Sequence, residues 1–240
     1  MKKEEDIKEQ FKKVLISTVK VISDEYEIED ELKKNSSSKN FNFFEIDNLN
    51  TKNDFIELRA KTDSEALKRK FSNKQIYQKN LPKNSSCRSL YDISEKIRYE
   101  LLGSQMLKGI SKNFYENYNY KIKIKRKDQL KTKEDVKVVE AFEIYMLKNF
   151  FNIKLNNLSQ KILSFWENDF KNSLDKHISF LKKNLENQDV YNAKFLQLLQ
   201  DMEIFDSSDD ENQRNDQQEN EQDNNPNKDN DNNPDGEQEK

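Results

Sequence analysis

The sequence is short of the residue types on which many enzyme sites depend. Its 240 residues include one cysteine, one histidine and three glycines. A single cysteine, Cys87, excludes a disulfide framework and a cysteine-rich metal site, and it favours a reducing compartment. With so little glycine the chain contains neither a GxxxxGK[ST] loop nor a GxGxxG loop. We therefore expect no ATPase site on this chain.

The sequence also has no long uncharged apolar run. A membrane-spanning helix needs about 18 or more such residues, and no stretch approaches that length. The N-terminus, MKKEEDIKEQ, mixes acidic with basic residues and lacks the apolar core of a signal peptide. We expect a soluble, cytoplasmic protein that does not enter a membrane.

Charge is unevenly distributed along the chain. The formal net charge is −3, but residues 206–240 contain 13 acidic and 3 basic residues, which leaves +7 on residues 1–205. The segment 206–240 has no hydrophobic side chain, so it cannot bury apolar surface to offset its chain entropy. The composition predicts one domain over residues 1–205, followed by a disordered acidic linker or tail over residues 206–240.

The stretch from Ser85 to Asn113 predicts one long central helix. Two apolar stripes follow its sequence at helical spacing on roughly opposite sides: Leu90, Ile93, Ile97 and Leu101 form one, and Tyr99, Leu102, Met106 and Ile110 form the other. A helix that is apolar on two sides is packed between neighbours. Gly103 and Gly109 each cost about 1 kcal/mol relative to alanine inside a helix, so we expect both glycines to have a packing role.

Further periodic segments predict a mainly α fold with a small β element. We expect amphipathic helices over residues 3–23, 133–151, 157–186 and 189–202, and a short helix from Asp63 to Phe71. Thr132 and Asp135 resemble a capping box that would open the helix over 133–151. Apolar residues alternate with polar ones from Tyr118 to Lys125, which is typical of a strand, and residues 41–46 and 54–58 could pair as an antiparallel ribbon.

Few side chains combine into a chemical site. His177 follows Leu174 on an apolar helix face, which favours a packing or hydrogen-bonding role over metal ligation. Cys87 could have a lowered pKa near a helix start, but a lone cysteine is more often structural. Glu95 and Arg98 are i,i+3 neighbours that we expect to pair on the helix surface, worth about 0.2–0.5 kcal/mol. We predict no catalytic, cofactor-binding or metal-binding residue on this chain.

A basic segment supports an alternative function. Residues 121–133 hold seven basic residues and one acidic residue, close to Tyr115, Tyr118 and Tyr120. This pattern is typical of a nucleic-acid-binding or general protein-interaction module. The segment could instead be a solvated strand and loop, or a surface that receives an acidic partner or the chain's own acidic tail. We rank nucleic-acid binding below these alternatives.

The central segment resembles a known family. The run from Glu95 to Gly109, EKIRYELLGSQMLKG, is similar to the ExxRxExxG…G segment in the T subunit of the aerobic cobaltochelatase. Weaker resemblance extends over most of residues 7–210, at the segments Phe11–Ile22, Arg59–Arg69, Ile162–Trp166 and Leu198–Met202, and at the acidic stretch that follows. We expect five residues of this run to fix the domain core rather than to contact a partner: Glu95, Arg98, Glu100, Gly103 and Gly109.

The resemblance implies a role in cobalamin biosynthesis. By this resemblance the chain is a non-ATPase subunit that assembles with an AAA+ ATPase subunit and a large metal-inserting subunit. The ATPase would bind ATP and Mg²⁺, and cobalt would be the substrate inserted into hydrogenobyrinic acid a,c-diamide. In the family the acidic linker leads to an integrin-like domain with a metal motif, whereas this sequence ends within the linker. Either the motif is missing or the sequence is a fragment.

Overall fold

The computed structural model describes residues 2–26, 49–123 and 130–202, of which residues 2–6 are described by their backbone alone. All elements within these ranges are helical, and no strand occurs in them. The mainly α fold class is therefore confirmed. The described helices belong to one compact unit, Met1–Glu203. The predicted strand over 41–46 and the predicted tail over 206–240 lie outside the described residues.

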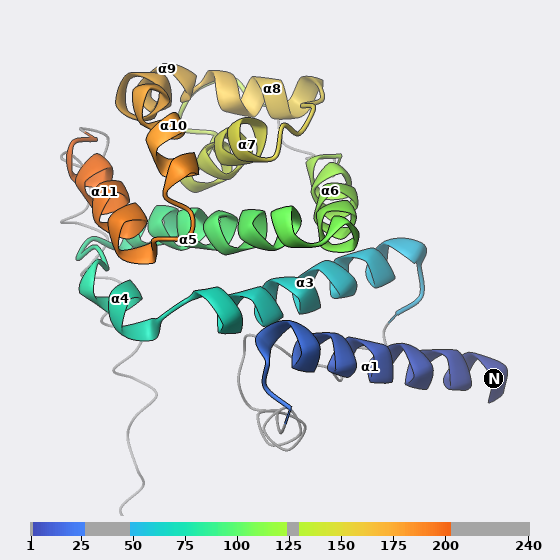
Figure 1. The fold of residues 1–240 in the computed structure, drawn as a ribbon. Helices are drawn as coiled ribbons and strands as arrows, with labels where there is room; N and C mark the ends of the chain where they lie inside the picture. Colours follow the sequence, from blue (N-terminus) through green and yellow to red (C-terminus); the bar gives the residue numbers. More distant parts are fainter. Residues whose placement is uncertain (1, 27–48, 124–129, 203–240) are drawn as a thin grey trace, which may run out of the picture. The chain divides into compact units, whose positions relative to one another are not determined.

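Four helices lie in successive layers, each packed on the next (Figure 1). They are, in order, α1 (Lys2–Ser23), α3 (Lys52–Phe71), α5 (Ser85–Met106) and α7 (Val138–Phe150). Helix α6 (Lys108–Ile122) packs against both α3 and α5, and α11 (Gln188–Gln200) packs against α5 and the short α4 (Lys74–Lys79). The central position predicted for the helix that starts at Ser85 is confirmed.

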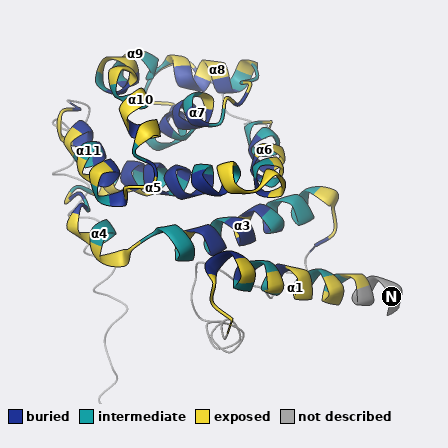
Figure 2. Cartoon of the chain, viewed as in Figure 1, coloured by how far each residue is buried: buried dark blue, intermediate teal, exposed yellow. Residues whose placement is uncertain are grey.

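Burial follows this arrangement. Helix α5 is dark along most of its length in Figure 2, and Leu90, Ile97 and Leu102 on its two apolar sides are at most 5% exposed. The two-sided stripe arises because α3, α6, α7 and α11 all contact this helix. One member of the second stripe, Met106, is 53% exposed because the helix ends there.

The predicted single helix over 85–113 is wrong beyond Met106. Leu107 has extended backbone angles, φ −134° and ψ 116°, and separates α5 from α6. The sequence around it contains no proline. The break changes the direction of the chain, so that Ile110, Phe114 and Tyr118 of α6 are buried against the rest of the unit. Tertiary packing of this face outweighs the continuous helical periodicity.

The strand predicted over 118–125 is also wrong. Residues up to Ile122 complete α6, and residues 124–129 lie outside the described part of the chain. The buried residues of α6 are spaced at helical intervals, at Ile110, Phe114, Asn117 and Tyr118. This spacing includes Asn117, a polar residue that an apolar-periodicity search passes over. The two-residue alternation therefore does not determine the structure.

Helix α3 replaces two other predicted elements. Thr51 accepts a hydrogen bond from the Asp54 backbone, and the Asp54 carboxylate accepts one from the Thr51 backbone at 2.6 Å, which forms a capping box. The predicted strand over 54–58 is wrong because this box opens a helix. The helix expected from Asp63 is the second half of α3, and its predicted end at Phe71 is confirmed.

The last third of the chain is more segmented than its periodicity indicates. The expected helix over 133–151 begins only at Val138, since Thr132 and Asp135 close a turn before it. The expected helix over 157–186 is divided into α8 (Asn157–Ser164), α9 (Glu167–Phe170), the π-helix η3 (Lys171–Asp175) and α10 (Lys176–Lys183). At the first break the Trp166 indole donates to the Val136 carbonyl at 3.0 Å. The helix over 189–202 is confirmed as α11.

Helix α1 confirms the predicted helix over 3–23, but its apolar residues are not all inside. Leu15 and Val19 are fully buried against α3, and Phe11 makes an edge contact with Phe55 at 5.1 Å between ring centroids. Ile7 and Val14, by contrast, are each 53% exposed.

Candidate functional site

The polar residues of the ExxRxExxG segment form a network inside the unit. Arg98 is 1% exposed and Glu95 is 4% exposed. The guanidinium donates from Nε to Glu95 Oε2 and from Nη2 to Oε1, both at 2.8 Å, so the pair is bidentate. The predicted pairing is confirmed, but its predicted place on the helix surface is wrong, because the i,i+3 spacing says nothing of which side of α5 neighbouring helices cover.

The remaining hydrogen-bonding capacity of this pair is directed to the backbone and side chains of other elements. Arg98 donates from Nη1 to the Leu185 carbonyl at 2.8 Å and from Nη2 to the Phe71 carbonyl at 2.7 Å. Glu95 accepts from the Ser72 hydroxyl and from Gln188 Nε2 at 3.0 Å. Because both charged groups are enclosed and partnered, this geometry supports a structural role rather than substrate chemistry.

Glu100 is the centre of a second buried cluster. It is 1% exposed and accepts hydrogen bonds from the Ser64 hydroxyl at 2.6 Å and from the Tyr118 hydroxyl. Burial raises the pKa of the Glu100 carboxyl, although Lys96 and both hydroxyl donors oppose that shift. Burial and the adjacent carboxylate likewise raise the pKa of Tyr118. With both groups enclosed by the described helices, this cluster is unsuited to receiving a substrate.

Two segments that carry the family resemblance meet at this cluster. Ser64 of the 59–69 segment contacts Glu100 of the 95–109 segment. The fully buried Leu67 lies against Gly103, where a methyl group would come within 2.3 Å of its Cδ1 atom. Between them, Asp63 accepts from Asn113 Nδ2 at 2.6 Å, and burial raises the pKa of the Asp63 carboxyl. The packing role predicted for Gly103 and the core role predicted for Glu95, Arg98 and Glu100 are confirmed.

Gly109 differs from Gly103. It is exposed at the start of α6, and a methyl group added there would meet no atom within 4 Å. The prediction that Gly109 has a packing role within this chain is therefore wrong. The sequence could not distinguish the two glycines, because only the helix break at Leu107 places the second one at the surface.

The other sequence candidates do not converge on one place. Cys87 is buried in the first turn of α5, where its backbone N–H donates to the Asn84 cap at 3.0 Å. His177 is half-buried on α10. Of the basic segment, Lys121 is half-buried and Lys133 lies 2.9 Å from Asp169 and over the Trp166 ring, while residues 124–129 lie outside the described ranges. Across the described chain, no three His, Cys, Asp or Glu side chains gather into a group that could hold a metal ion.

Sequence reasoning missed the partners of the buried charges. Glu95 is bound by Gln188 of α11, and Glu100 is bound by Ser64 of α3 and Tyr118 of α6. Asp63 is bound by Asn113 of α6. Gln188 lies 93 residues from Glu95 along the chain, and nothing in the local sequence around it signals that contact. A buried carboxylate needs donors, but periodicity does not say which ones.

The fold and this network define a helical domain whose charged motif organises its own core. The family described as "Cobalamin biosynthesis protein CobT" matches residues 5–240, and the chain belongs to this family. The family implies a role in cobalamin biosynthesis, consistent with a subunit of the chelatase complex in which it generally works. No solved structure matches the chain. None of the helices in the described part of the chain has the length and hydropathy of a membrane span.

Proposed function

We propose that this chain is the non-ATPase assembly subunit of an ATP-dependent cobaltochelatase. In this proposal it assembles with an AAA+ ATPase subunit and a large metal-inserting subunit, in the cytoplasm, and cobalt enters hydrogenobyrinic acid a,c-diamide as the substrate metal. The observation that carries the proposal is the family match over residues 5–240. In this proposal ATP and Mg²⁺ bind to the ATPase partner and not to this chain.

The charge network supports an assembly role over a catalytic one. The motif side chains Glu95, Arg98 and Glu100 are each at most 4% exposed and are hydrogen-bonded to groups within the unit. A general acid, base or metal ligand must reach its substrate. With these groups enclosed, the exposed helix surfaces remain as the means by which the described part of the chain acts.

The proposal is tested by reconstitution with the ATPase and large subunits from the same organism. The purified chain is expected to copurify with the ATPase in at least one of three conditions: ATP, ADP or no nucleotide. Cobalt insertion is expected to require all three proteins, and ATP hydrolysis is expected only when the ATPase is present. Failure to associate in every condition, or cobalt insertion at the same rate without this chain, would overturn the proposal.

A control variant tests whether assembly responds to an arbitrary change of surface charge. Lys171→Glu changes one exposed charge on η3, remote in sequence from the motif, and is expected to leave assembly unchanged.

The alternative function has its own test. We would favour a nucleic-acid-binding module if the chain bound RNA or DNA at physiological salt and if Lys123→Glu with Arg126→Glu abolished that binding.

A further inference from the structure

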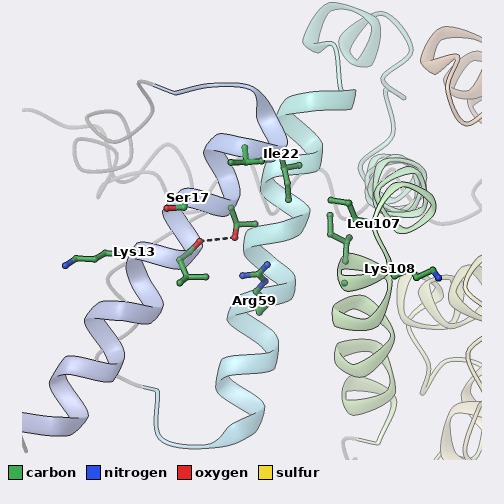
Figure 3. A pocket seen from close by; sticks show the side chains of 11 residues that line it. Lys13, Ser17, Ile22, Arg59, Leu107 and Lys108 are labelled. Carbon is green, nitrogen blue, oxygen red and sulfur yellow. Dashed lines mark hydrogen bonds between the residues drawn. The ribbon is translucent and has the colours of Figure 1, made fainter.

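An open groove runs between α1 and α6. Its volume is about 590 Å³, and five of its eleven lining residues have apolar side chains: Val14, Val21, Ile22, Leu107 and Ile110. Figure 3 shows α1 on one side, α6 on the other and α3 between them. A small ligand is usually enclosed over most of its surface, whereas this groove is open to solvent. Its shape suits a segment of another protein.

Exposed apolar residues on α1 extend the groove into a stripe. Ile7, Val14 and Val21 are 53%, 53% and 64% exposed and follow one another at intervals of seven residues. Seven residues fall about 20° short of two helical turns, so the three side chains lie on one face of α1. A seven-residue apolar repeat is the pattern by which one helix packs along another. The stripe therefore indicates a helical occupant.

The charges around the groove indicate the chemistry of that occupant. Lys13, Arg59 and Lys108 are among the lining residues, and none of the described residues that line the groove is acidic. Arg59 is paired with Asp63 at 3.3 Å, so the two lysines supply the charge for an occupant. Lys13 and Lys108 lie at opposite edges and point outward (Figure 3). A second copy of the same surface would bring lysines against lysines, which is unfavourable. Complementarity requires acidic residues beside the apolar face of the bound helix.

The start of α6 has features that its own fold does not require. Leu107, the residue before the helix, is 48% exposed and makes no side-chain cap, although a polar residue at such a position is worth about 1 kcal/mol. Gly109 leaves open space at the groove, since a methyl group added to it would have no atom within 4 Å. An occupant that made an apolar contact with Leu107 and approached the backbone closely at Gly109 would account for both residues.

We propose that the groove between α1 and α6 binds an amphipathic helix with acidic flanks from the ATPase subunit. This inference rests on the proposed function, because it assigns the helix to that subunit. The bound helix places its apolar face against Val14, Val21 and Leu107 and its carboxylates beside Lys13 and Lys108. Such helix-in-groove recognition draws its affinity from a few buried apolar anchors.

The experiment measures affinity of the full chain for the ATPase subunit. Val14→Asp with Val21→Asp is expected to weaken binding at least about tenfold, because charges would face an apolar partner surface. Both side chains are more than half exposed, so we expect the variant to fold. Leu107→Asn is expected to raise the melting temperature through capping and still weaken binding, which a folding defect cannot explain. Phe180→Asp, at a 43% exposed residue on α10, is the matched control and is expected to bind as wild type.

The charge component is tested separately. Lys13→Glu with Lys108→Glu is expected to weaken binding and to flatten its dependence on salt, because salt screens exposed charge pairs. If the apolar and charge variants bind as wild type, the groove proposal is overturned while the proposed function stands. If wild type itself does not bind, the proposed function falls and the groove assignment with it. If the variants instead disperse a homodimer of this chain, a second copy occupies the groove and the inference is overturned.

Discussion

Gly103 and Gly109 have the same residue type and lie six positions apart, but their surroundings differ. A methyl group at Gly103 would lie 2.3–2.9 Å from three atoms of the Leu67 side chain, which is fully buried. A methyl group at Gly109 would enter open space. The two substitutions are therefore expected to change stability in opposite directions.

Gly103→Ala is expected to lower the free energy of unfolding by about 1–3 kcal/mol, the usual cost of overpacking a core. Gly109→Ala is the matched control and is expected to be neutral or stabilising by up to about 1 kcal/mol. Urea unfolding followed by circular dichroism measures both. In a double variant with Leu67→Ala, the added methyl group occupies part of the space left by Leu67, so the two costs should not add. Equal stability of the two single variants would contradict this packing.

Glu100 makes stability depend on pH. Its folded-state pKa is raised above the ordinary value of 4.5. Between 4.5 and the raised value, the folded protein holds a proton that the unfolded chain has lost, so this group's contribution to stability falls as pH rises. Below 4.5 both states are protonated and the contribution is constant.

Glu100→Gln removes this titration. Relative to wild type, the variant is expected to gain stability as pH rises from 4.5 toward the raised pKa, because the buried amide stays neutral. Chemical unfolding at several pH values measures the difference between the two proteins. Glu143→Gln, a substitution at a half-exposed carboxylate on α7, is the control. A difference between Glu100→Gln and wild type that is independent of pH would contradict the raised pKa.

At the scale of elements, Arg98 connects two other parts of the chain to α5. Its guanidinium binds Glu95 within the helix, the carbonyl of Phe71 at the end of α3, and the carbonyl of Leu185 ahead of α11. An interaction treated as a local helix pair is thus a junction between elements. Its removal leaves the buried Glu95 carboxylate without its cationic partner and two carbonyls without the guanidinium donor.

Arg98→Met is expected to lower the free energy of unfolding by about 3–5 kcal/mol, the range found when one partner of a buried ion pair is removed. Lys148→Met is the matched control. Lys148 contacts Glu167 at 3.0 Å, but its side chain is 45% exposed, so a loss of less than about 1 kcal/mol is expected. The double variant Arg98→Met with Glu95→Gln should recover part of the stability, because no charge then remains buried at the position of the Glu95–Arg98 pair. Equal effects of Arg98→Met and Lys148→Met would refute the buried junction.

At the scale of the whole described unit, the helices are unequally supported. Helix α5 contacts α3, α6, α7 and α11, whereas α1 packs chiefly against α3. An element with few partners opens at a lower free energy than the core. We expect amide hydrogen exchange in α1 to proceed through local opening, and exchange in the middle of α5 only through global unfolding. Denaturant-dependent exchange measures this, and the same opening free energy in both helices would contradict it.

Binding of the ATPase subunit should change this pattern. If the groove is occupied, exchange around Val14 and Val21 of α1 should slow on complex formation, because opening of α1 would then require dissociation. Exchange in α10, around Phe180, should not change. This measurement locates the interface without any substitution.

The sequence by itself determined the helical class, the central place of the segment that starts at Ser85, the C-terminal end of α3, the helix α11, and the core role of the Glu95–Gly103 motif. These features depend on local chemistry and on apolar periodicity, which a linear pattern contains. The family resemblance depends on the same motif, whose residues the fold keeps within its core.

Tertiary structure alone decided the rest. It broke the helix at Leu107, since the face of Ile110, Phe114 and Tyr118 is buried only when α6 turns toward α3 and α5. It enclosed the Glu95–Arg98 pair, because Gln188 and the carbonyl of Leu185 arrive from about ninety residues away. It also left Val14 exposed and Gly103 covered. Burial is a property of what other elements cover, and a one-dimensional pattern does not specify those elements.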